Sequence, residues 1–536
     1  MPRAMITSLQ PDAVETGARV LRQGGNAVDA ALACAFVQTV VDPMMCGIAG
    51  FGAMQVYMPG RGIHEIIDFH GRVPAAATPD MWQGRILGET EDGFGFVLKD
   101  AVNDLGYQAI TTPGTCRAFA EASHRYGTLA WAELIEPAIT CAREGFVVRP
   151  GVHGYWIAPD QPGRTSVRER LAFSPEGRTV YFGSDGEPHG IGSVVRNPGM
   201  AFSLEEIARY GAEVFYEGEI AARIDADMRA HGGLLSARDL ATYATDTGDP
   251  LWGNYRGYRL ATNRPPGGGI MLVEMLNILE NFDLVAMGHN SPAYIRTVAE
   301  AMKIATVDKD NHVGDPRFKE VPLERLTDKA YARGHSRAIE AGKKAHVERM
   351  PLAEAPGTTH LVTADREGNI VTMTHTLGMM SGVITEGLGF MYNGAMAVFD
   401  PRPGRTGSIA PGKARFSSLC PTIVFDDERP VLALGAPGGT QIAMGVLQVI
   451  LNVIEFGMSP QEAILAPRFS ATSDTITVTA RIPRYLCAEL EAEGYRVERS
   501  PFSYDIASVH AIGFDSGGHP SGGADIPYGD GMALSV

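Results

Sequence analysis

GTTHLVTADREGNIVTMTHT, residues 357–376, is the stretch of sequence that decides the fold. Two β-branched segments of alternating polarity flank the three residues Arg366-Glu367-Gly368, and this pattern predicts a β-hairpin whose loop ends in glycine. If Asp365 faces Asn369, Thr376 lies directly opposite Thr358. Opposed residues of a hairpin project to the same face, with Cβ atoms roughly 5 Å apart. The two threonine hydroxyls are therefore expected to meet.

Two facing threonines behind a glycine favour a chain that cleaves itself between Gly357 and Thr358 and then uses Thr358 as a nucleophile. A threonine hydroxyl needs a base, and a free α-amine on the same residue, with a pKa near 8, can supply it. An internal Thr358 has no such amine, so cleavage must come first. Glycine before the bond tolerates strained backbone. On these residues alone an ordinary edge hairpin remains the alternative.

Short motifs follow one another along the chain in a fixed order, and the order is more specific than any single motif. They are Gly24-Gly25-Asn26-Ala27-Val28-Asp29-Ala30-Ala31, Asp68-Phe69, Pro113-Gly114-Thr115, Gly232-Gly233-Leu234, Pro265-Pro266-Gly267-Gly268-Gly269, Gly314-Asp315-Pro316, Thr358-Thr359-His360, Ser417-Ser418 and Pro437-Gly438-Gly439-Thr440. In this order the chain resembles the γ-glutamyltransferase (glutathione hydrolase) family of N-terminal nucleophile (Ntn) hydrolases.

The resemblance implies an α/β (α+β) fold, a four-layer αββα sandwich assembled from two fragments of one self-cleaved precursor. Residues 1–357 would form a large subunit and residues 358–536 a small catalytic subunit, and together they would make one composite domain. The absence of a long linker or an internal repeat also favours one sandwich over independent domains.

The resemblance also assigns roles to catalytic residues. Thr376 matches the family threonine that hydrogen-bonds the nucleophile, in agreement with the hairpin register. Gly438 and Gly439 match the pair that lines the oxyanion hole, and their position between an expected strand and helix suits that role. A plain strand-to-helix turn is the alternative for the two glycines. His360 follows the family pattern, and we expect it to be structural rather than a general base.

The substrate-binding positions both match the family and depart from it. Ser417 and Ser418 match the serines that hold the donor's α-carboxylate. The family arginine that follows Asp-Phe is replaced by His70, with Arg72 two residues further on. Gly378 stands where relatives place an asparagine that binds the substrate's α-ammonium.

Ala395 and Val398 occupy the segment in which relatives carry a polar residue and a carboxylate. Burying an ammonium group there without a partner would cost several kcal/mol. We therefore expect an amidohydrolase for an amide that lacks the α-ammonium, with any carboxylate held by Ser417, Ser418 and either His70 or Arg72. By resemblance, oxamate-like amides and acyl side chains of the β-lactam acylase kind both occur in the wider family, and the sequence does not choose between them. The alternatives are a true glutathione hydrolase or γ-glutamyltransferase, and an uncleaved non-catalytic scaffold.

Composition agrees with a small-molecule enzyme. The chain has 536 residues, 45% of them hydrophobic, and a net charge of −16, which argues against nucleic acid or an anionic membrane as partner. Neither a signal peptide nor a membrane-spanning stretch is recognisable, so a cytoplasmic location is expected. A higher oligomer is possible. The mechanism requires no cofactor.

Metal binding is not expected from the motifs. The six cysteines, Cys34, Cys46, Cys116, Cys141, Cys420 and Cys487, form no Cys-x-x-Cys pair and are expected to be free thiols. The segment Asp308-Lys309-Asp310-Asn311-His312 has alternating oxygen ligands, but Val313 stands where a calcium loop requires glycine.

Hydrophobic periodicity and capping residues predict the remaining elements. We expect helices over 13–21, 26–41, 270–279 and 439–456, helix starts at Ser203 and Ser236, and strands over 53–57, 64–69, 422–425 and 431–434. Residues 410–421 are expected to form a loop. The charged segment 323–356 is expected to be exposed and to become a mobile C-terminus after cleavage.

Overall fold

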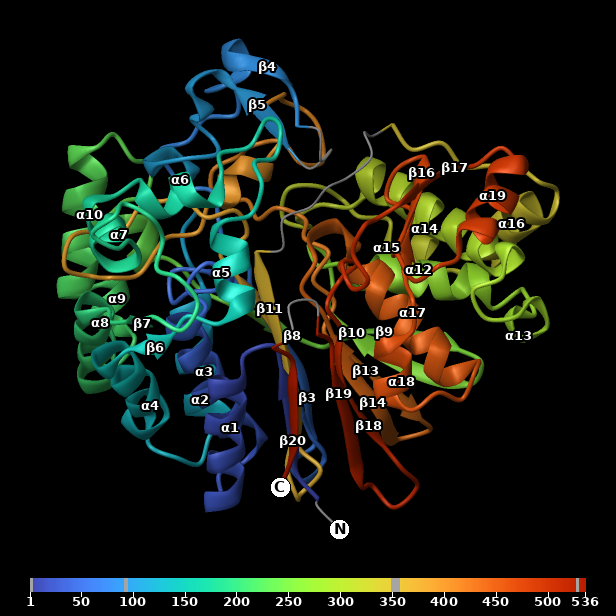
Figure 1. Ribbon diagram of the computed structural model, residues 1–536, viewed down its shortest axis with the longest axis horizontal. Coiled ribbons are helices and arrows are strands. Elements are labelled where there is room, and N and C mark those ends of the chain that lie inside the picture. Colours follow the sequence, from blue (N-terminus) through green and yellow to red (C-terminus); the bar gives the residue numbers. More distant parts are fainter. Residues whose placement is uncertain (1–2, 91–94, 349–356, 527–529) are drawn as a thin grey trace.

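The computed structural model describes residues 3–90, 95–348, 357–526 and 530–536. Two large sheets lie face to face at the centre, and a layer of helices covers the outer face of each sheet (Figure 1). The hydrophobic cluster between the sheets contains Val362 and Ile370 of the first sheet and Ile423 and Ile512 of the second. This is the predicted αββα sandwich.

The first sheet is formed by seven antiparallel strands from both ends of the chain. In spatial order they are β20 (Met532–Ser535), β1 (Met5–Ser8), β11 (Thr358–Ala364), β12 (Ile370–Thr376), β2 (Phe51–Met58), β3 (Ile63–Phe69) and β8 (Asp246–Gly248). Because β1 lies between β20 and β11, residues before and after position 358 share one sheet. The two segments therefore build one composite unit.

The second sheet has six strands and is also antiparallel. Its order is β19 (Pro520–Ala524), β18 (His510–Phe514), β14 (Arg429–Gly435), β13 (Thr422–Asp426), β10 (Tyr258–Thr262) and β9 (Leu251–Tyr255). The smaller strands are β4 (Ile86–Glu89) with β5 (Phe96–Leu98), β6 (Phe146–Val147) with β7 (Val194–Val195), and β15 (Phe469–Ser470) with β16 (Thr475–Val478) and β17 (Arg496–Arg499).

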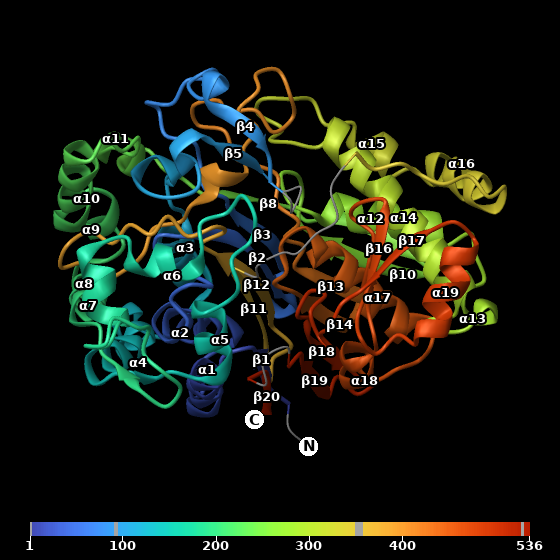
Figure 2. The same ribbon diagram turned by 45° about the horizontal axis from the view of Figure 1, so that its top comes forward.

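Two groups of helices form the outer layers (Figure 2). Beside the first sheet are α1 (Pro11–Gln23), α2 (Ala27–Val41), α3 (Thr115–Tyr126), α4 (Trp131–Glu144), α5 (Pro150–Trp156), α6 (Val167–Ala172), α7 (Pro175–Tyr181), α8 (Pro198–Tyr210), α9 (Glu213–Tyr216), α10 (Glu219–Ala230) and α11 (Ala237–Ala241). Beside the second are α12 (Gly269–Leu279), α13 (Leu284–Met287), α14 (Pro292–His312), α15 (Leu323–Leu326), α16 (Lys329–Glu340), α17 (Ile442–Ile454), α18 (Pro460–Leu465) and α19 (Arg484–Ala492).

The hairpin register agrees with the prediction. Thr358 pairs with Thr376, and Ala364 pairs with Ile370. Gly368, at the end of the loop, has φ +81°, a conformation that glycine adopts at little cost. The alternative of an edge hairpin is wrong, because β11 pairs with β1 on its other side and every residue of β11 and β12 is buried.

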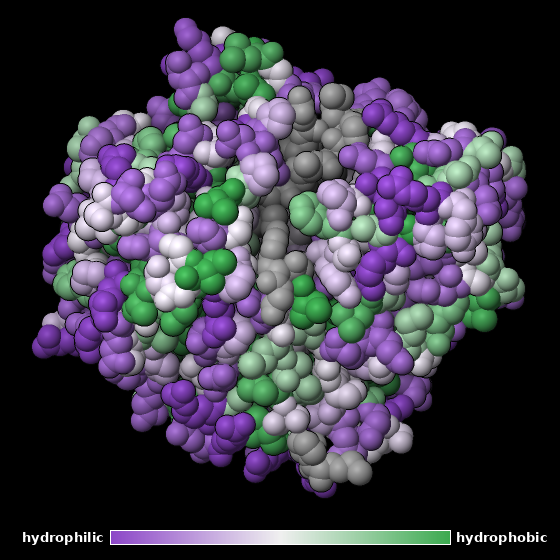
Figure 3. Space-filling view, viewed as in Figure 1, coloured by the Kyte–Doolittle hydropathy of each residue, from purple (hydrophilic) through white to green (hydrophobic). Residues whose placement is uncertain are grey.

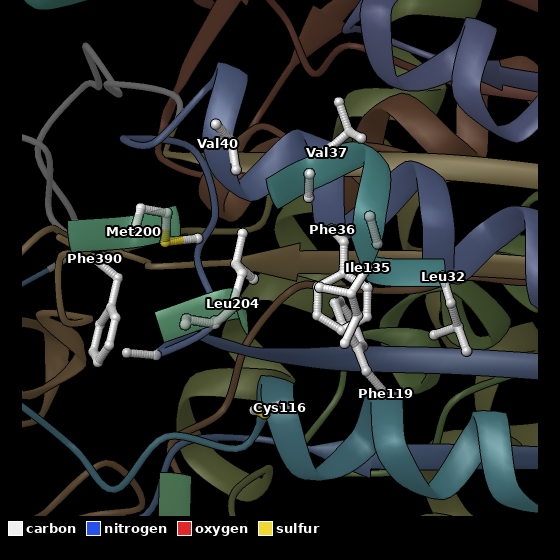
Figure 4. Packing of buried hydrophobic residues seen from close by; sticks show 14 of the residues in the cluster. Leu32, Phe36, Val37, Val40, Cys116, Phe119, Ile135, Met200, Leu204 and Phe390 are labelled. Atoms are coloured by element: carbon white, nitrogen blue, oxygen red, sulfur yellow. The ribbon is translucent and has the colours of Figure 1, made fainter. Parts of the chain in front are cut away.

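Helix α2 is the buried helix of the first layer. Asn26 and Asp29 form a capping box at its start, and all of its residues are buried because it packs between the sheet and neighbouring helices. Figure 4 shows Phe36 of α2 beside Phe119 of α3; their ring centroids lie 5.1 Å apart in a T-shaped arrangement. The nearly apolar composition of this helix follows from contacts on every side.

One predicted helix start is wrong and another is confirmed. Ser203 lies inside α8, which begins after Asn197; the Asn197 side chain accepts a hydrogen bond from the N–H of Met200. The Ser203 hydroxyl instead donates to the carbonyl of Leu388. Pro198 directly after Asn197 was the stronger start signal. Ser236 caps α11 as predicted, in a capping box with Asp239.

Other expectations can be compared directly with the described residues. The six cysteines are free thiols. Among the described helices, none is long and apolar enough to cross a membrane. Figure 3 shows a largely hydrophilic face on which apolar residues occur in small groups. Residues 349–356, the end of the segment expected to become mobile, lie outside the described residues.

Buried histidines give the fold a testable pH dependence. His510 is fully buried, neither ring nitrogen has a partner among the described residues, and burial lowers its pKa to about 3. Between pH 6.5 and 5 an unfolded histidine binds a proton that folded His510 does not. This one residue therefore lowers the free energy of unfolding by about 1.4 kcal/mol for each pH unit below 6.5.

The variant His510→Leu should lose this contribution. Relative to the parent, its free energy of unfolding should rise by about 2 kcal/mol between pH 6.5 and pH 5. Urea denaturation at both pH values would measure the difference, in a Thr358→Ala background so that the chain stays in one piece. The exposed His124, changed to Leu, is the control. A pH-independent difference for His510→Leu would contradict the assignment.

Candidate active site

A pocket opens where β11 begins and β12 ends, and its empty volume, part of which is open to solvent, is about 830 Å³. Its wall is mainly apolar. The lining residues are Phe51, His70, Gly71, Gln161, Gly357, Thr358, Thr376, Gly378, Met379, Ala395, Val398, Phe399, Arg415, Phe416, Ser417, Ser418, Leu419, Gly439 and Ile442. Among these described residues there is one histidine and no carboxylate, which is not a metal-binding set.

Thr358 and Thr376 meet in this pocket, as the hairpin register predicted. Their hydroxyl oxygens lie 3.0 Å apart, and the two residues are 6% and 2% exposed. The Thr376 hydroxyl donates to the carbonyl oxygen of Gly357 and accepts a 2.7 Å hydrogen bond from the N–H of Gly378. Thr376 therefore contacts both the Thr358 hydroxyl and the carbonyl group that precedes it.

Counting protons fixes the direction of these hydrogen bonds. A threonine hydroxyl has one proton, and Thr376 gives it to the Gly357 carbonyl. The hydrogen bond between the two hydroxyls must then be donated by Thr358. The Thr358 oxygen keeps lone pairs for attack, while the carbonyl of Gly357 is polarised by the hydrogen bond that it accepts.

Position 357 requires glycine because its backbone lies close to that of Gly378, not because its backbone angles are unusual. A Cβ atom at this position would lie 2.4 Å from the carbonyl oxygen of Gly378. Gly357 does not have a positive φ. From the sequence, glycine is expected here because it tolerates a strained backbone, but the structure shows that glycine is needed because a side chain would not fit. Any side chain at position 357 would push the Gly357 carbonyl away from Thr376.

Gly438 and Gly439 lie at the start of the helical segment formed by a 3₁₀ turn, Gly439–Gln441, and α17. Their φ values are +136° and +54°, and a Cβ on Gly438 would lie 2.7 Å from the Cα of Ala507. Gly439 lines the pocket. The first N–H groups of a helix have no acceptor within it, so this turn suits the binding of a developing negative charge.

His70 connects the pocket to Asp68. Its Nδ1 lies 2.8 and 2.9 Å from the two Asp68 carboxylate oxygens, and its Nε2 lies 2.5 Å from the Ser417 hydroxyl. A carboxylate only accepts, so Nδ1 carries a proton. In the neutral ring Nε2 is then an acceptor, and Ser417 donates its proton to His70. The imidazole is buried, 3% exposed, at the pocket wall.

The structure separates the two candidates for the missing family arginine. Arg72 does not line the pocket; its guanidinium donates to Asp246 at 2.8 Å and to the carbonyl of Ala244, in a neighbouring groove. His70 does line it. The expectation that Arg72 could bind the substrate is therefore wrong. Its backbone forms a strand-like bridge to Thr112, and its side chain lies outside the pocket.

Ser418 lies in the pocket beside Ser417. The glycine run before α12 holds this pair in place: the N–H of Gly268 donates to Leu419, and a Cβ on Gly268 would lie 2.5 Å from the carbonyl oxygen of Ser418. The motif Pro265-Pro266-Gly267-Gly268-Gly269 thus positions Ser418 by close backbone contact. The sequence alone did not indicate this connection.

The three positions at which the sequence departs from the family pattern also come together. Gly378, Ala395 and Val398 all line the pocket; Gly378 follows β12, whereas Ala395 and Val398 lie in one 3₁₀ turn, Ala395–Val398. Gly378 has φ +64°, and its N–H supports Thr376, so it contributes backbone rather than a side chain to the site.

His360 lies outside the pocket lining and is fully buried. Its Nδ1 lies 2.8 Å from the hydroxyl of Thr374, its Nε2 lies 3.1 Å from that of Thr372, and burial lowers its pKa well below the usual value. These contacts within the sheets favour the predicted structural role.

Several pocket residues were missed in the sequence. Phe51 pairs with Thr376 across β2 and β12, so the register of the neighbouring strand was the signal that could have found it. Gln161, Met379, Phe416 and Ile442 reach the pocket from loops and a helix start, and no local motif marks them.

A four-layer sandwich with a threonine at the start of a central strand and an apolar pocket beside it defines the class of Ntn amide hydrolases and acyltransferases. Within this class, residues 13–535 match the Gamma-glutamyltranspeptidase family, and the chain belongs to that family.

Similar proteins carry two kinds of name. The acylase ACY 1 proenzyme of Pseudomonas sp. (strain V22) is 37% identical over 529 residues, 97% of this chain and 92% of the relative. The glutathione hydrolase proenzyme of Escherichia coli (strain K12) is 34% identical over 521 residues, 92% and 86% of the two chains. The crystal structure of cephalosporin acylase from Bacillus halodurans matches with a TM-score of 0.87 at 28% identity, covering 100% of this chain and 96% of that one.

Proposed function

We propose that the chain cleaves itself between Gly357 and Thr358, leaving residues 1–357 and 358–536 as the large and small subunits. The hydroxyl of Thr358 attacks the carbonyl carbon of Gly357, whose oxygen accepts a hydrogen bond from Thr376. An ester forms as the peptide C–N bond breaks and the Thr358 nitrogen takes a proton. Water then hydrolyses the ester. The proenzyme names of the relatives support this reading.

In the mature enzyme, the new α-amine of Thr358 accepts the proton of the Thr358 hydroxyl. The oxygen attacks the substrate amide, and the N–H groups at Gly438 and Gly439 stabilise the oxyanion. The leaving amine takes the proton from the Thr358 ammonium group, and water releases the acyl group from the acyl-enzyme. The hydrogen bond between the Thr358 and Thr376 hydroxyls orients the nucleophile.

The substrate is an amide whose acyl group lacks the glutamyl α-ammonium. The observation that carries this proposal is the pocket wall, whose described residues include no carboxylate and place Gly378, Ala395 and Val398 where an amine would need acceptors. An unpaired ammonium there would cost several kcal/mol. The names of two similar proteins, an acylase proenzyme and a cephalosporin acylase, support the hydrolysis of an acyl amide.

His70, Ser417 and Ser418 are the residues that would bind a carboxylate group on the acyl part of the substrate. With a neutral ring, the Ser417 proton is donated to His70 and the serine oxygen offers only lone pairs to the pocket. If a carboxylate enters beside Ser418, the Ser417 hydroxyl can turn away from Nε2 of His70 and donate to it. Oxamate-like or dicarboxylic acyl groups would bind in this way.

Three p-nitroanilides isolate these features. γ-Glutamyl-p-nitroanilide carries the ammonium and the carboxylate, glutaryl-p-nitroanilide lacks only the ammonium, and butyryl-p-nitroanilide lacks both. We expect kcat/KM for the glutaryl substrate to exceed that for the γ-glutamyl substrate by about 100-fold or more, equivalent to about 3 kcal/mol. The butyryl substrate shows whether the carboxylate contributes. Equal or faster turnover of the γ-glutamyl compound would establish a glutathione hydrolase or γ-glutamyltransferase instead.

A further inference from the structure

Helices α12, α14 and α16 lie in the second outer layer (Figure 2), and a cluster of possible metal ligands lies between them. Glu274 lies on α12, Asp308 on α14 and His335 on α16, and one ligand atom of each lies within 4.8 Å of the others. None of the three lines the active-site pocket. The cluster is therefore separate from the site described above.

The two carboxyl groups of the cluster are buried close to one another. Glu274 is 2% exposed and Asp308 is 8% exposed. The Oε1 atom of Glu274 is buried and has no hydrogen-bond partner among the described residues. Two facing carboxylates cannot both remain ionised in an apolar interior unless a cation or a proton lies between them. A bound cation or a shared proton would meet this requirement.

Neighbouring groups orient the potential ligands. The hydroxyl of Tyr331 donates a 2.7 Å hydrogen bond to Asp308 Oδ2, and the Tyr331 ring packs edge-on against His335, with centroids 4.6 Å apart. His335 is half-buried, and an imidazole is a common ligand of transition-metal ions. A hydrogen bond that fixes a ligating carboxylate is typical of the outer shell of metal sites.

We propose that Glu274, Asp308 and His335 bind one divalent transition-metal ion, Zn²⁺ or Mn²⁺. Two carboxylates and a neutral imidazole carry a charge that one divalent ion cancels. The imidazole ligand and the small number of protein oxygens disfavour Ca²⁺ and Mg²⁺. The pairwise limit of 4.8 Å is wider than a bound ion requires, so binding would draw the three side chains together.

A bound metal ion would link α16 to helices α12 and α14. Helix α16 has only two fully buried residues, Ala332 and Ser336, whereas α12 is buried throughout. A metal ion would anchor this peripheral helix, which precedes the segment that ends at Gly357. The effect would be on stability rather than on turnover.

Metal titration of the purified, chelator-treated protein tests the proposal. Zn²⁺ or Mn²⁺ should bind with a stoichiometry near one by calorimetry, and should raise the Tm by about 3 °C or more, while Mg²⁺ should not. Both effects should disappear in His335→Gln and in Glu274→Gln. His335 is only half-buried, so its variant remains informative if Glu274→Gln does not fold.

His312→Gln is the matched control, because His312 lies on α14, 3.9 Å from Asp308, but outside the cluster. It should keep the binding and the Tm shift. Unchanged binding in His335→Gln, or no binding of either ion to the parent protein, would overturn the proposal; the two carboxyl groups then share a proton instead. These experiments measure metal binding and thermal stability and not amide hydrolysis. Their outcome therefore does not depend on whether the proposed reaction is correct.

Discussion

Replacing Thr358 with alanine should leave a single full-length band on a denaturing gel and abolish amide hydrolysis. In the proposed mechanism the same hydroxyl makes both attacks, first on Gly357 and then on the substrate; among the described residues it is this hydroxyl that donates to Thr376. The wild-type protein should separate into fragments 1–357 and 358–536. Losing the nucleophile should lower turnover by at least about 10⁴-fold.

Thr358→Ser provides the matched control, because it keeps the hydroxyl and, after cleavage, the α-amine. It should process and turn over substrate at a reduced rate. N-terminal sequencing of active wild-type protein should find a chain that begins Thr-Thr-His. Active protein with only the sequence of the original N-terminus would refute the mechanism, and a wild-type band that never converts would favour the non-catalytic scaffold.

The hairpin was predictable because its determinants are local. Alternation of polarity sets which side chains share a face, and the loop ending at Gly368 sets the register, so Thr358 and Thr376 could be paired from sequence. The central position of β11 was not predictable in the same way. Its neighbour β1 comes from more than 300 residues away, and only tertiary packing decides that pairing.

The sequence predicted the site residues that belong to a recognisable motif. It did not predict those whose position depends on irregular backbone. His70 and Arg72 both follow the end of β3, where no strand periodicity fixes the direction of a side chain. The neighbouring Asp68 holds His70 at the pocket, whereas Asp246, 174 residues further along the chain, holds Arg72 away from it. The apolar wall at Met379 and Phe416 likewise depends on how separate loops converge.

Thr376→Val should slow both self-cleavage and turnover while leaving the fold intact. Valine has the shape of threonine but removes the hydroxyl that donates to Gly357 and accepts from Thr358 and Gly378. The loss of one such donor costs about 3 kcal/mol of transition-state stabilisation, so we expect a decrease of about 100-fold in each rate. Gel time courses and p-nitroanilide kinetics on the fraction that has been processed would measure the two effects separately.

Thr374→Val is the control on the same strand. Its hydroxyl lies 2.8 Å from Nδ1 of the buried His360 and does not line the pocket. This variant should lose stability, by about 1–3 kcal/mol for an unpartnered buried group, and keep its catalytic rate. Processing of Thr376→Val at the wild-type rate would mean that the Thr358 hydroxyl needs no orienting acceptor. The polarised Gly357 carbonyl would then be a consequence of packing rather than part of the cleavage reaction.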